Sequence, residues 1–172
     1  ELKENDLERI HDLLLKSVSM RSYSDVPVGC FLSGGVDSSL VAALFQKVNN
    51  SQINTFSIGF KDSSYDESTY ARMIASHLGT KHHELIVDES HLLDMVDEVF
   101  NAYSEPFSDS SQIPTLLVSR YAREHVTVAL SGDGGDELAC GYARYNLYNR
   151  LMKIKSILPD RLLGVLRSLM KS

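Results

Sequence analysis

The sequence predicts an α/β protein with a doubly wound, mainly parallel sheet and helices on both of its faces. Four short segments are expected to be strands, at 28–32, 53–58, 81–87 and 126–130, and those at 28–32 and 126–130 are apolar enough to be buried. Segments with the apolar spacing of helices separate or follow them, at 36–47, 66–78, 90–102 and 114–124. Strands that alternate with helices form right-handed βαβ units, so their strands run parallel. Ligands bind such sheets beyond the carboxyl ends of the strands.

Helices are also expected at both ends of the chain. Residues 1–23 carry an apolar stripe that should face the core, namely Leu7, Ile10, Leu14, Leu15 and Val18. The helix at 36–47 should bury a face that holds Val36, Leu40, Ala43 and Leu44. Ser64 or Asp66 is expected to cap the next helix, and Gly79 to end it. Residues 147–172 have the pattern of two helices broken at Pro159.

Composition and charge exclude several classes of protein. The 172 residues suffice for one domain with a sizeable core, and the formal net charge of −6 argues against a nucleic-acid partner. Because no apolar stretch has membrane-spanning length, we expect no membrane partner and a cytoplasmic location. Cys30 is expected in the core, and the two cysteines indicate no disulfide framework. The spacing of the histidines fits no zinc site, so we expect structural or solvated roles for His77, His82, His83 and His91.

The stretch from 28 to 43, VGCFLSGGVDSSLVAA, predicts an anion site. A strand, a glycine turn and a helix in succession direct backbone amides and the positive end of the helix dipole at one point. Glycines let the backbone approach a phosphate, and Ser33, Ser38 and Ser39 supply hydroxyl donors. Asp37 would repel a bare phosphate, which indicates a bridging Mg²⁺. The lysine of the Walker loop is absent, and an ordinary strand–helix turn with an Asp cap is the alternative.

The run SGGVDSS, residues 33–39, resembles the SGGxDS loop of the N-type ATP pyrophosphatases. That group includes asparagine, GMP, NAD and argininosuccinate synthetases, and its fold is described as adenine nucleotide alpha-hydrolase-like. The resemblance implies that the loop holds the β- and γ-phosphates of ATP and leaves the α-phosphate open to a nucleophile. It identifies the chemistry and not the substrate.

A second glycine turn, SGDGGDE at 131–137, follows the strand expected at 126–130. It carries three carboxylates, which repel one another unless they are solvated, protonated or bridged by a cation. A flexible surface loop would solvate them, whereas a loop at the carboxyl end of a buried strand, facing the first loop, is placed to hold Mg²⁺. We therefore expect the two loops to share one crevice.

The second loop narrows the resemblance to one family. SGDGGDEL, with Gly141-Tyr142 and Arg144-Tyr145 after it, is similar to the SG(E/D)GxDE…GGYxRY block of asparagine synthetases. GTKHHE at 79–84 and EPFSDSS at 105–111 are similar to other segments of that family, in order and with fitting spacing. From the residues alone, the polar stretch at 101–111 is either functional or a solvated crossover. The match covers about 26–145.

The resemblance implies roles for single residues. Leu32 and Ile58 would contact the adenosine of ATP. The β- and γ-phosphates would lie against the first loop, at Ser33, Gly34, Gly35, Asp37, Ser38 and Ser39. Ser131 and Gly132 would contact the nucleotide from the second loop. Asp37 and Asp136 would ligate Mg²⁺, and Asp133 stands where many members carry a glutamate important for forming the acyl-adenylate.

The implied reaction is attack of a carboxylate, with aspartate the first choice, on the α-phosphate of MgATP. Pyrophosphate leaves, and ammonia released from glutamine by an N-terminal glutaminase domain of a longer protein then attacks the acyl carbon. Residues 1–172 would be part of the synthetase domain, with a leading helix at 1–25, a nucleotide-binding core at 26–145 and truncated C-terminal helices at 146–172. We expect the fragment alone to be inactive, and a homodimer is left open.

Two other functions stay open at this point. A related amidotransferase could act on another carboxylate, for example in a surface-polysaccharide pathway, and a degenerate nucleotide-binding module would lack catalysis. The chain reads DELACGY at 136–142 where the family often reads DELFGGY. Ala139 and Cys140 therefore change the packing behind the second loop. The loop acids are all present, which argues for an enzyme.

Overall fold

The computed structural model describes residues 4–61, 68–105 and 108–157. The strands are β1 (Val28–Phe31), β2 (Asn54–Phe60), β3 (Lys81–Val87) and β4 (Val128–Leu130). The helices are α1 (Glu4–Ser22), α2 (Val36–Val48), α3 (Ser68–Leu78), α4 (Glu89–Asp94), α5 (Val96–Ala102), α6 (Gln112–Arg123), α7 (Gly135–Ala139) and α8 (Ala143–Ile157). The chain divides into two compact units, the first ending at Asp133 and the second beginning at Gly134.

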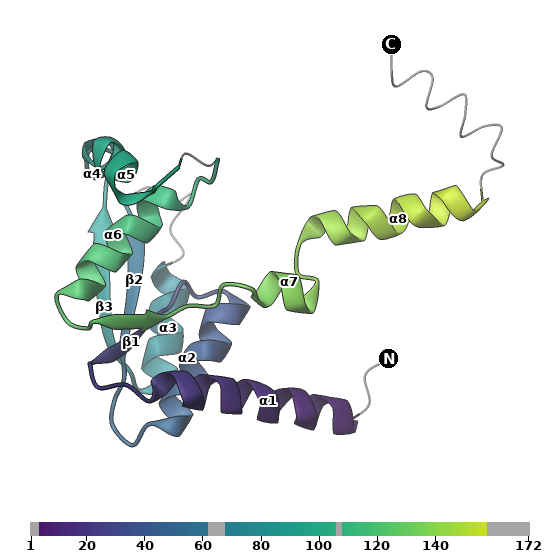
Figure 1. Ribbon diagram of the computed structural model, residues 1–172, viewed down its shortest axis with the longest axis horizontal. Coiled ribbons are helices and arrows are strands. Elements are labelled where there is room, and N and C mark those ends of the chain that lie inside the picture. The colour runs from purple at the N-terminus through teal and green to yellow at the C-terminus, as the bar shows by residue number, and fades with distance from the viewer. Residues whose placement is uncertain (1–3, 62–67, 106–107, 158–172) are drawn as a thin grey trace, which may run out of the picture. The chain divides into compact units, whose positions relative to one another are not determined.

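The first unit holds a parallel sheet with strand order β3-β2-β1-β4, which confirms the predicted fold class (Figure 1). The chain moves outward from β1 to β2 and β3, then returns to place β4 on the other side of β1. The direction of winding therefore changes between β1 and β4. In open parallel sheets this switch point is where ligands bind, just beyond the carboxyl ends of the strands.

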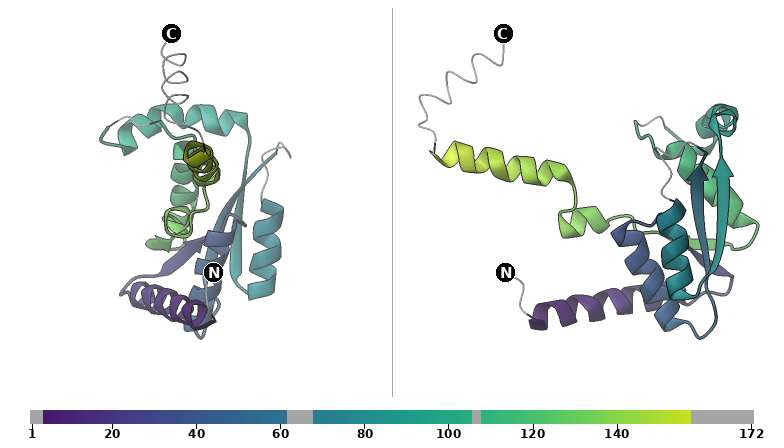
Figure 2. Two further views of the ribbon diagram at one scale, coloured as in Figure 1. Left: turned by 90° about the vertical axis from the view of Figure 1, so that its right-hand side faces the viewer. Right: turned by 180° about the vertical axis from the view of Figure 1, so that it is seen from behind.

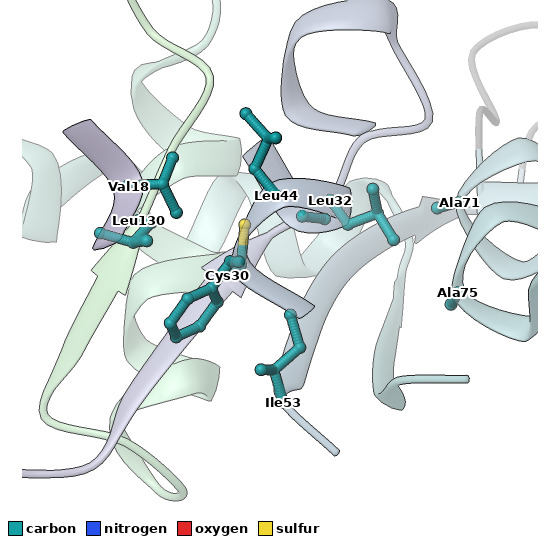
Figure 3. Close-up of a cluster of buried hydrophobic side chains, with 10 residues drawn as sticks. Val18, Cys30, Leu32, Leu44, Ile53, Ala71, Ala75 and Leu130 are labelled. Carbon is teal, nitrogen blue, oxygen red and sulfur yellow. The ribbon is translucent and has the colours of Figure 1, made fainter. Parts of the chain in front are cut away.

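Helices pack on both faces of the sheet (Figure 2). On one face, residues from α1, α2 and α3 form a buried cluster with strand residues, and Figure 3 shows most of it: Val18, Cys30, Leu32, Leu44, Ile53, Ala71, Ala75 and Leu130. On the other face, α6 packs against Phe56, and a third cluster joins Val87 to Met95 and Leu117. Cys30 is fully buried, as predicted.

The two predicted helix faces were wrong in part. Only the C-terminal half of α1 is covered, because Val18 is buried whereas Leu7 is 55% exposed and Ile10 is 42% exposed. In α2 the buried residues are Ser38, Ala42, Leu44 and Phe45. Val36, which was expected to face the core, is 83% exposed because it opens the helix beyond the end of the sheet.

Several element boundaries differ from the prediction. β2 continues beyond the expected end at residue 58, through Gly59 to Phe60. The helix expected at 90–102 is two helices, α4 and α5, with the buried Met95 between them. α6 begins at Gln112 rather than at Pro114. Gly79 ends α3 in the left-handed conformation, φ +69°, as predicted, whereas Ser64, Asp66 and Pro159 lie outside the described residues.

Among the described residues, no helix is long and apolar enough to cross a membrane. The division of the first unit from the second at Asp133 does not test the expected segments 1–25, 26–145 and 146–172, which stay a prediction.

Candidate functional site

The first loop joins the end of β1 to the start of α2. Gly35 is the N-cap of α2, in extended conformation (φ −70°, ψ 163°), and no side chain caps the helix. The first hydrogen bond of the helical pattern runs from the Ser39 amide to the Gly35 carbonyl, 3.1 Å. The amides of the first turn therefore point away from the helix body without an intrahelical acceptor. With the dipole of a 13-residue helix behind them, they form a site for an anion.

The serine hydroxyls of this loop are already arranged by the protein. Ser33 Oγ lies 2.9 Å from Ser38 Oγ and accepts a hydrogen bond from the Gly35 amide, 3.3 Å. Ser38 Oγ also accepts from the Ser33 amide, 3.2 Å. Ser38 Oγ also lies 3.2 Å from the Gly35 carbonyl, to which it can donate. Its single proton serves either that carbonyl or Ser33 Oγ, and the proton of Ser33 is left for a ligand only in the second case. The Ser39 hydroxyl instead donates to the Gly35 carbonyl, 2.6 Å, and so has no second proton to offer.

Gly34 has a backbone conformation that fits glycine, and a helix lies directly behind it. Its φ of +88° is in the left-handed region. A Cβ at this position would lie 2.7 Å from the Cβ of Tyr70 and 2.8 Å from the Ala71 amide nitrogen, both in the first turn of α3. The first loop is therefore backed by the N-terminal end of α3.

The start of the second loop, residues 131–133 of the first unit, packs against the first loop. β1 and β4 are neighbouring parallel strands, with Cys30 opposite Leu130, so both loops leave the sheet at the same edge. A Cβ on Gly132 would lie 2.7 Å from the Ser38 amide nitrogen and 2.9 Å from the Asp37 carbonyl carbon. Such distances are essentially never seen for a real Cβ. The expected convergence of the Ser33 and Ser131 loops is confirmed, and Gly132 is what allows it.

The acidic residues lie in both units. In the first unit, Asp37 is half-buried in the first turn of α2, and Asp133 is exposed and accepts a hydrogen bond from Ser131 Oγ, 3.0 Å. In the second unit, Asp136 lies in the first turn of α7, and a Cβ on Gly141 would collide with its carboxylate. Tyr142 donates to Glu137, 2.7 Å, and this bond lowers the pKa of Glu137.

Two residues expected to contact the adenosine are placed by their strands. The Leu32 side chain is 1% exposed within the apolar cluster, and its amide donates to the Phe56 carbonyl, 2.8 Å. The Leu32 carbonyl is therefore the polar group of this residue that is left to contact a ligand. Ile58 is half-buried and packs against the cluster that contains Val87. The binding roles of both residues stay predictions.

The contribution of α3 was missed from the sequence. Besides its contact with Gly34, α3 approaches β2 so closely that a Cβ on Gly59 would lie 3.0 Å from Ser68. A glycine inside a strand often marks such a close approach, so the signal was Gly59 itself. His82 and His83 are hydrogen-bonded to residues of β2, which confirms structural roles for these two histidines.

The fold and the two glycine loops define an α/β domain of the adenine nucleotide alpha-hydrolase-like class. Solved structures of that fold include the NH3-dependent NAD synthetase from Campylobacter jejuni, in complex with nitrate. The structural match covers 79% of this chain and 60% of the NAD synthetase chain, with 19% sequence identity and a TM-score of 0.56. The glutamine-dependent NAD+ synthetase from Acinetobacter baumannii, in complex with ADP, has a TM-score of 0.54 at 17% identity and covers 78% of this chain and 27% of its own.

The chain belongs to the asparagine synthase family, whose model matches residues 9–172. The Methanocaldococcus jannaschii protein assigned as glutamine-hydrolysing asparagine synthetase 2 is 44% identical over 141 residues, which is 81% of this chain and 27% of the relative. Glutamine-hydrolysing asparagine synthetase 1 of Bacillus subtilis is 34% identical over 149 residues, 87% of this chain and 23% of its own length. The chain thus spans about a quarter of the length of these relatives.

Proposed function

We propose that this chain binds MgATP and that, within a longer protein, it activates a carboxylate as an acyl-adenylate for amidation by ammonia. The observation that supports this most strongly is the close packing of the Gly132 backbone against the Ser38 amide. It places two glycine loops around the N-terminus of α2, at the switch point of the sheet. That arrangement suits a ligand with one highly charged end, as a nucleoside triphosphate has.

The β- and γ-phosphates are assigned to the first loop. The amides that open α2 donate to phosphate oxygens, as does the Ser33 hydroxyl when it accepts the hydrogen bond of Ser38, and the helix dipole adds partial positive charge. Hydrogen bonds to a charged group are about twice as strong as neutral ones, so this loop holds the leaving pyrophosphate more firmly than the adenosine. The α-phosphate then faces the second loop, where Asp133 and Ser131 lie next to each other.

The residues at the carboxyl edge of the sheet fit a Mg²⁺ ion that binds together with the nucleotide. Among the residues that the structure describes, no three or more His, Cys, Asp or Glu side chains form a metal cage. Mg²⁺ is usually held by one or two carboxylates together with substrate phosphates, and the Asp37 carboxylate supplies a ligand of that kind. The ion would neutralise charge on the departing pyrophosphate. Asp136 is the second proposed ligand, on the resemblance alone.

Aspartate is the proposed carboxylate substrate and glutamine the proposed source of ammonia, because the relatives are named glutamine-hydrolysing asparagine synthetases and asparagine is the amide of aspartate. In this account, ammonia attacks the acyl-adenylate and asparagine and AMP leave. A glutaminase domain, in the part of a longer protein outside this match, would be the partner. An adenine nucleotide also agrees with the ADP held by one synthetase of the same fold.

Calorimetric titration of the chain with MgATP tests nucleotide binding, and magnesium pyrophosphate serves as a competitor for the first loop. Ser33→Ala should weaken MgATP binding by about 10- to 100-fold, since it removes a hydrogen bond to a charged group worth about 1.5–3 kcal/mol. Ser39→Ala is the matched control, because its hydroxyl donates within the loop, and it should change the affinity by less than about threefold. Equal losses in both variants, or no competition by pyrophosphate, would contradict the assignment.

Pyrophosphate release from MgATP with aspartate and ammonium tests the reaction. The 172-residue chain spans about a quarter of the length of its relatives, so groups that they use for catalysis can lie outside it. Lack of even one preorganised group commonly costs about 10²–10³ in rate, so the chain should bind MgATP without aspartate-dependent release of pyrophosphate. Robust aspartate-dependent release would show that the chain is sufficient for adenylation. Release that depends on another carboxylate would favour the related amidotransferase.

A further inference from the structure

A buried polar layer lies between α3 and the paired strands β2 and β3. The parallel register places Thr55 beside His82 and Ser57 beside Glu84. Because side chains alternate along a strand, these four share one face of the sheet. Contacts of α3 with both strands and the close approach of Ser68 to Gly59 show that this is the face that α3 covers. Thr55 is 0% exposed and Ser57 is 3% exposed, so hydroxyl groups occupy what is usually an apolar interface.

His82 links the buried hydroxyls. Its Nδ1 lies 3.0 Å from Thr55 Oγ1 and its Nε2 lies 3.2 Å from Ser57 Oγ, so both ring nitrogens have a partner on β2. Thr55 Oγ1 also lies 2.8 Å from Thr80 Oγ1, at the turn that leaves α3. A neutral imidazole has one donor and one acceptor, and hydroxyls can fill either role. The layer is therefore satisfied with an uncharged ring.

An ion pair connects this layer to the helix. Arg72 of α3 lies 3.6 Å from Glu84 of β3, whose side chain is only 18% exposed. The other carboxylate oxygen of Glu84 is buried and finds no hydrogen-bond partner in the described part of the chain. Glu84 therefore depends on Arg72 for its charge balance, and the pair fixes the first half of α3 against the strands. That part of α3 carries Tyr70 and Ala71, which lie behind Gly34 of the phosphate loop.

We propose that His82 is a positioning residue for the nucleotide site. By bridging Thr55 and Ser57 as a neutral ring, it maintains the polar layer to which Arg72 and Glu84 attach α3, and α3 in turn sets the position of Gly34. The inference rests on the proposed function, because it concerns the same phosphate loop. His82 itself has no contact with the ligand in this account.

The charge of the ring controls the arrangement. Protonation would force both nitrogens to donate, would place a positive charge near Arg72, and would draw Glu84 away from it. Burial lowers the pKa of His82, Glu84 raises it and Arg72 lowers it, and burial is the largest of these effects. In the folded protein, His82 therefore stays neutral until the pH falls below the ordinary histidine pKa of about 6.5. The neutral arrangement is fully present above that pH and is lost as the pH falls through the lowered pKa.

The test is MgATP affinity between pH 7.5 and pH 5.5 for the wild-type chain, His82→Gln and His83→Gln. Glutamine can bridge the two hydroxyls but cannot be protonated. His83→Gln is the matched control, because His83 is the next residue of β3 and lies on the opposite face, stacked on Phe56. Dividing each affinity by that of His82→Gln at the same pH removes the titration of the nucleotide itself.

We expect the wild-type affinity to fall by about 2- to 30-fold relative to His82→Gln as the pH drops, the range typical for coupling through a packed network. His83→Gln should follow the wild type. A ratio that stays constant over the whole range, or an acid effect abolished equally by His83→Gln, would overturn the role of His82. Absence of MgATP binding by the wild type at pH 7.5 would contradict the proposed function itself, and this inference with it.

Arg72→Gln provides a second route if His82→Gln does not fold, since the Arg72 side chain is 52% exposed and its loss leaves no cavity. It should weaken MgATP binding at pH 7.5 by a similar factor while the circular dichroism spectrum stays unchanged. Arg123→Gln removes the same charge at the end of α6, where Arg123 donates to the Thr127 carbonyl, and should leave the affinity unchanged. Equal affinity of the Arg72 and Arg123 variants would refute the proposal.

Discussion

Gly132→Ala is the substitution that bears most directly on the convergence of the two loops. Its Cβ would lie 2.7 Å from the Ser38 amide nitrogen, against roughly 3.4 Å for an ordinary contact, so the loops must separate by about 0.7 Å. Overpacking of this kind costs about 1–3 kcal/mol of stability. The methyl group would also cover the Ser38 amide, and loss of one hydrogen bond to phosphate is worth about 1.5–3 kcal/mol. We expect MgATP affinity to fall by about 10- to 100-fold.

Gly29→Ala is the control for this experiment. Its Cβ would lie 2.6 Å from the ring of Phe56, so the clash is as severe, but Gly29 lies in β1, away from the carboxyl end of the strand. Thermal unfolding and calorimetric titration with MgATP are measured on both variants. Both should lose stability, and only Gly132→Ala should lose affinity after correction for the folded fraction. Unchanged affinity in Gly132→Ala, or an equal loss in Gly29→Ala, would refute the account of the loops.

Three further predictions concern the cation and the two cysteines. Asp37→Asn and Asp136→Asn should each reduce the Mg²⁺-dependent part of ATP binding, measured by titration with and without the ion; unchanged Mg²⁺ dependence in both would assign the carboxylates another role. Burial raises the pKa of the Cys30 thiol to about 12. A thiol reagent at pH 8 should therefore modify exposed Cys140 at once and Cys30 only on unfolding. Rapid reaction of two thiols in the native chain would contradict the buried position of Cys30. Cys140 has φ 58°, so Cys140→Gly should stabilise the end of α7 by about 1 kcal/mol, seen as slower amide exchange, whereas Ala139→Gly should speed exchange there.

The sheet could be predicted because β1 and β4 are short apolar runs and because strands that alternate with helices along the chain require βαβ units. The convergence of the two glycine loops follows from the same topology, since β1 and β4 are parallel neighbours. The buried faces of the helices were harder to predict, because amphipathic spacing alone does not show how far a neighbouring element extends. Val36 has the right spacing for the core, but it lies in the first turn of α2, where no strand remains to cover it.

The role of α3 could not be predicted from local sequence. Gly59 looked like the end of a strand, whereas it is the point at which Ser68 approaches β2 within the strand. The polar layer was equally hidden, because histidine, threonine and serine in a strand read as a solvated face until a helix is known to cover them. Its hydrogen bonds join β2 to β3, and its ion pair joins β3 to α3.

The most direct test of the central claim is a crystal structure of this chain with Mg²⁺ and a non-hydrolysable ATP analogue. The account predicts the β- and γ-phosphates within hydrogen-bond distance of the Ser38 amide and the Ser33 hydroxyl, with Gly132 against the same turn of α2. The Asp37 carboxylate should lie in the coordination sphere of the ion. Phosphates bound away from the N-terminus of α2, or nucleotide bound with the first loop empty, would contradict it.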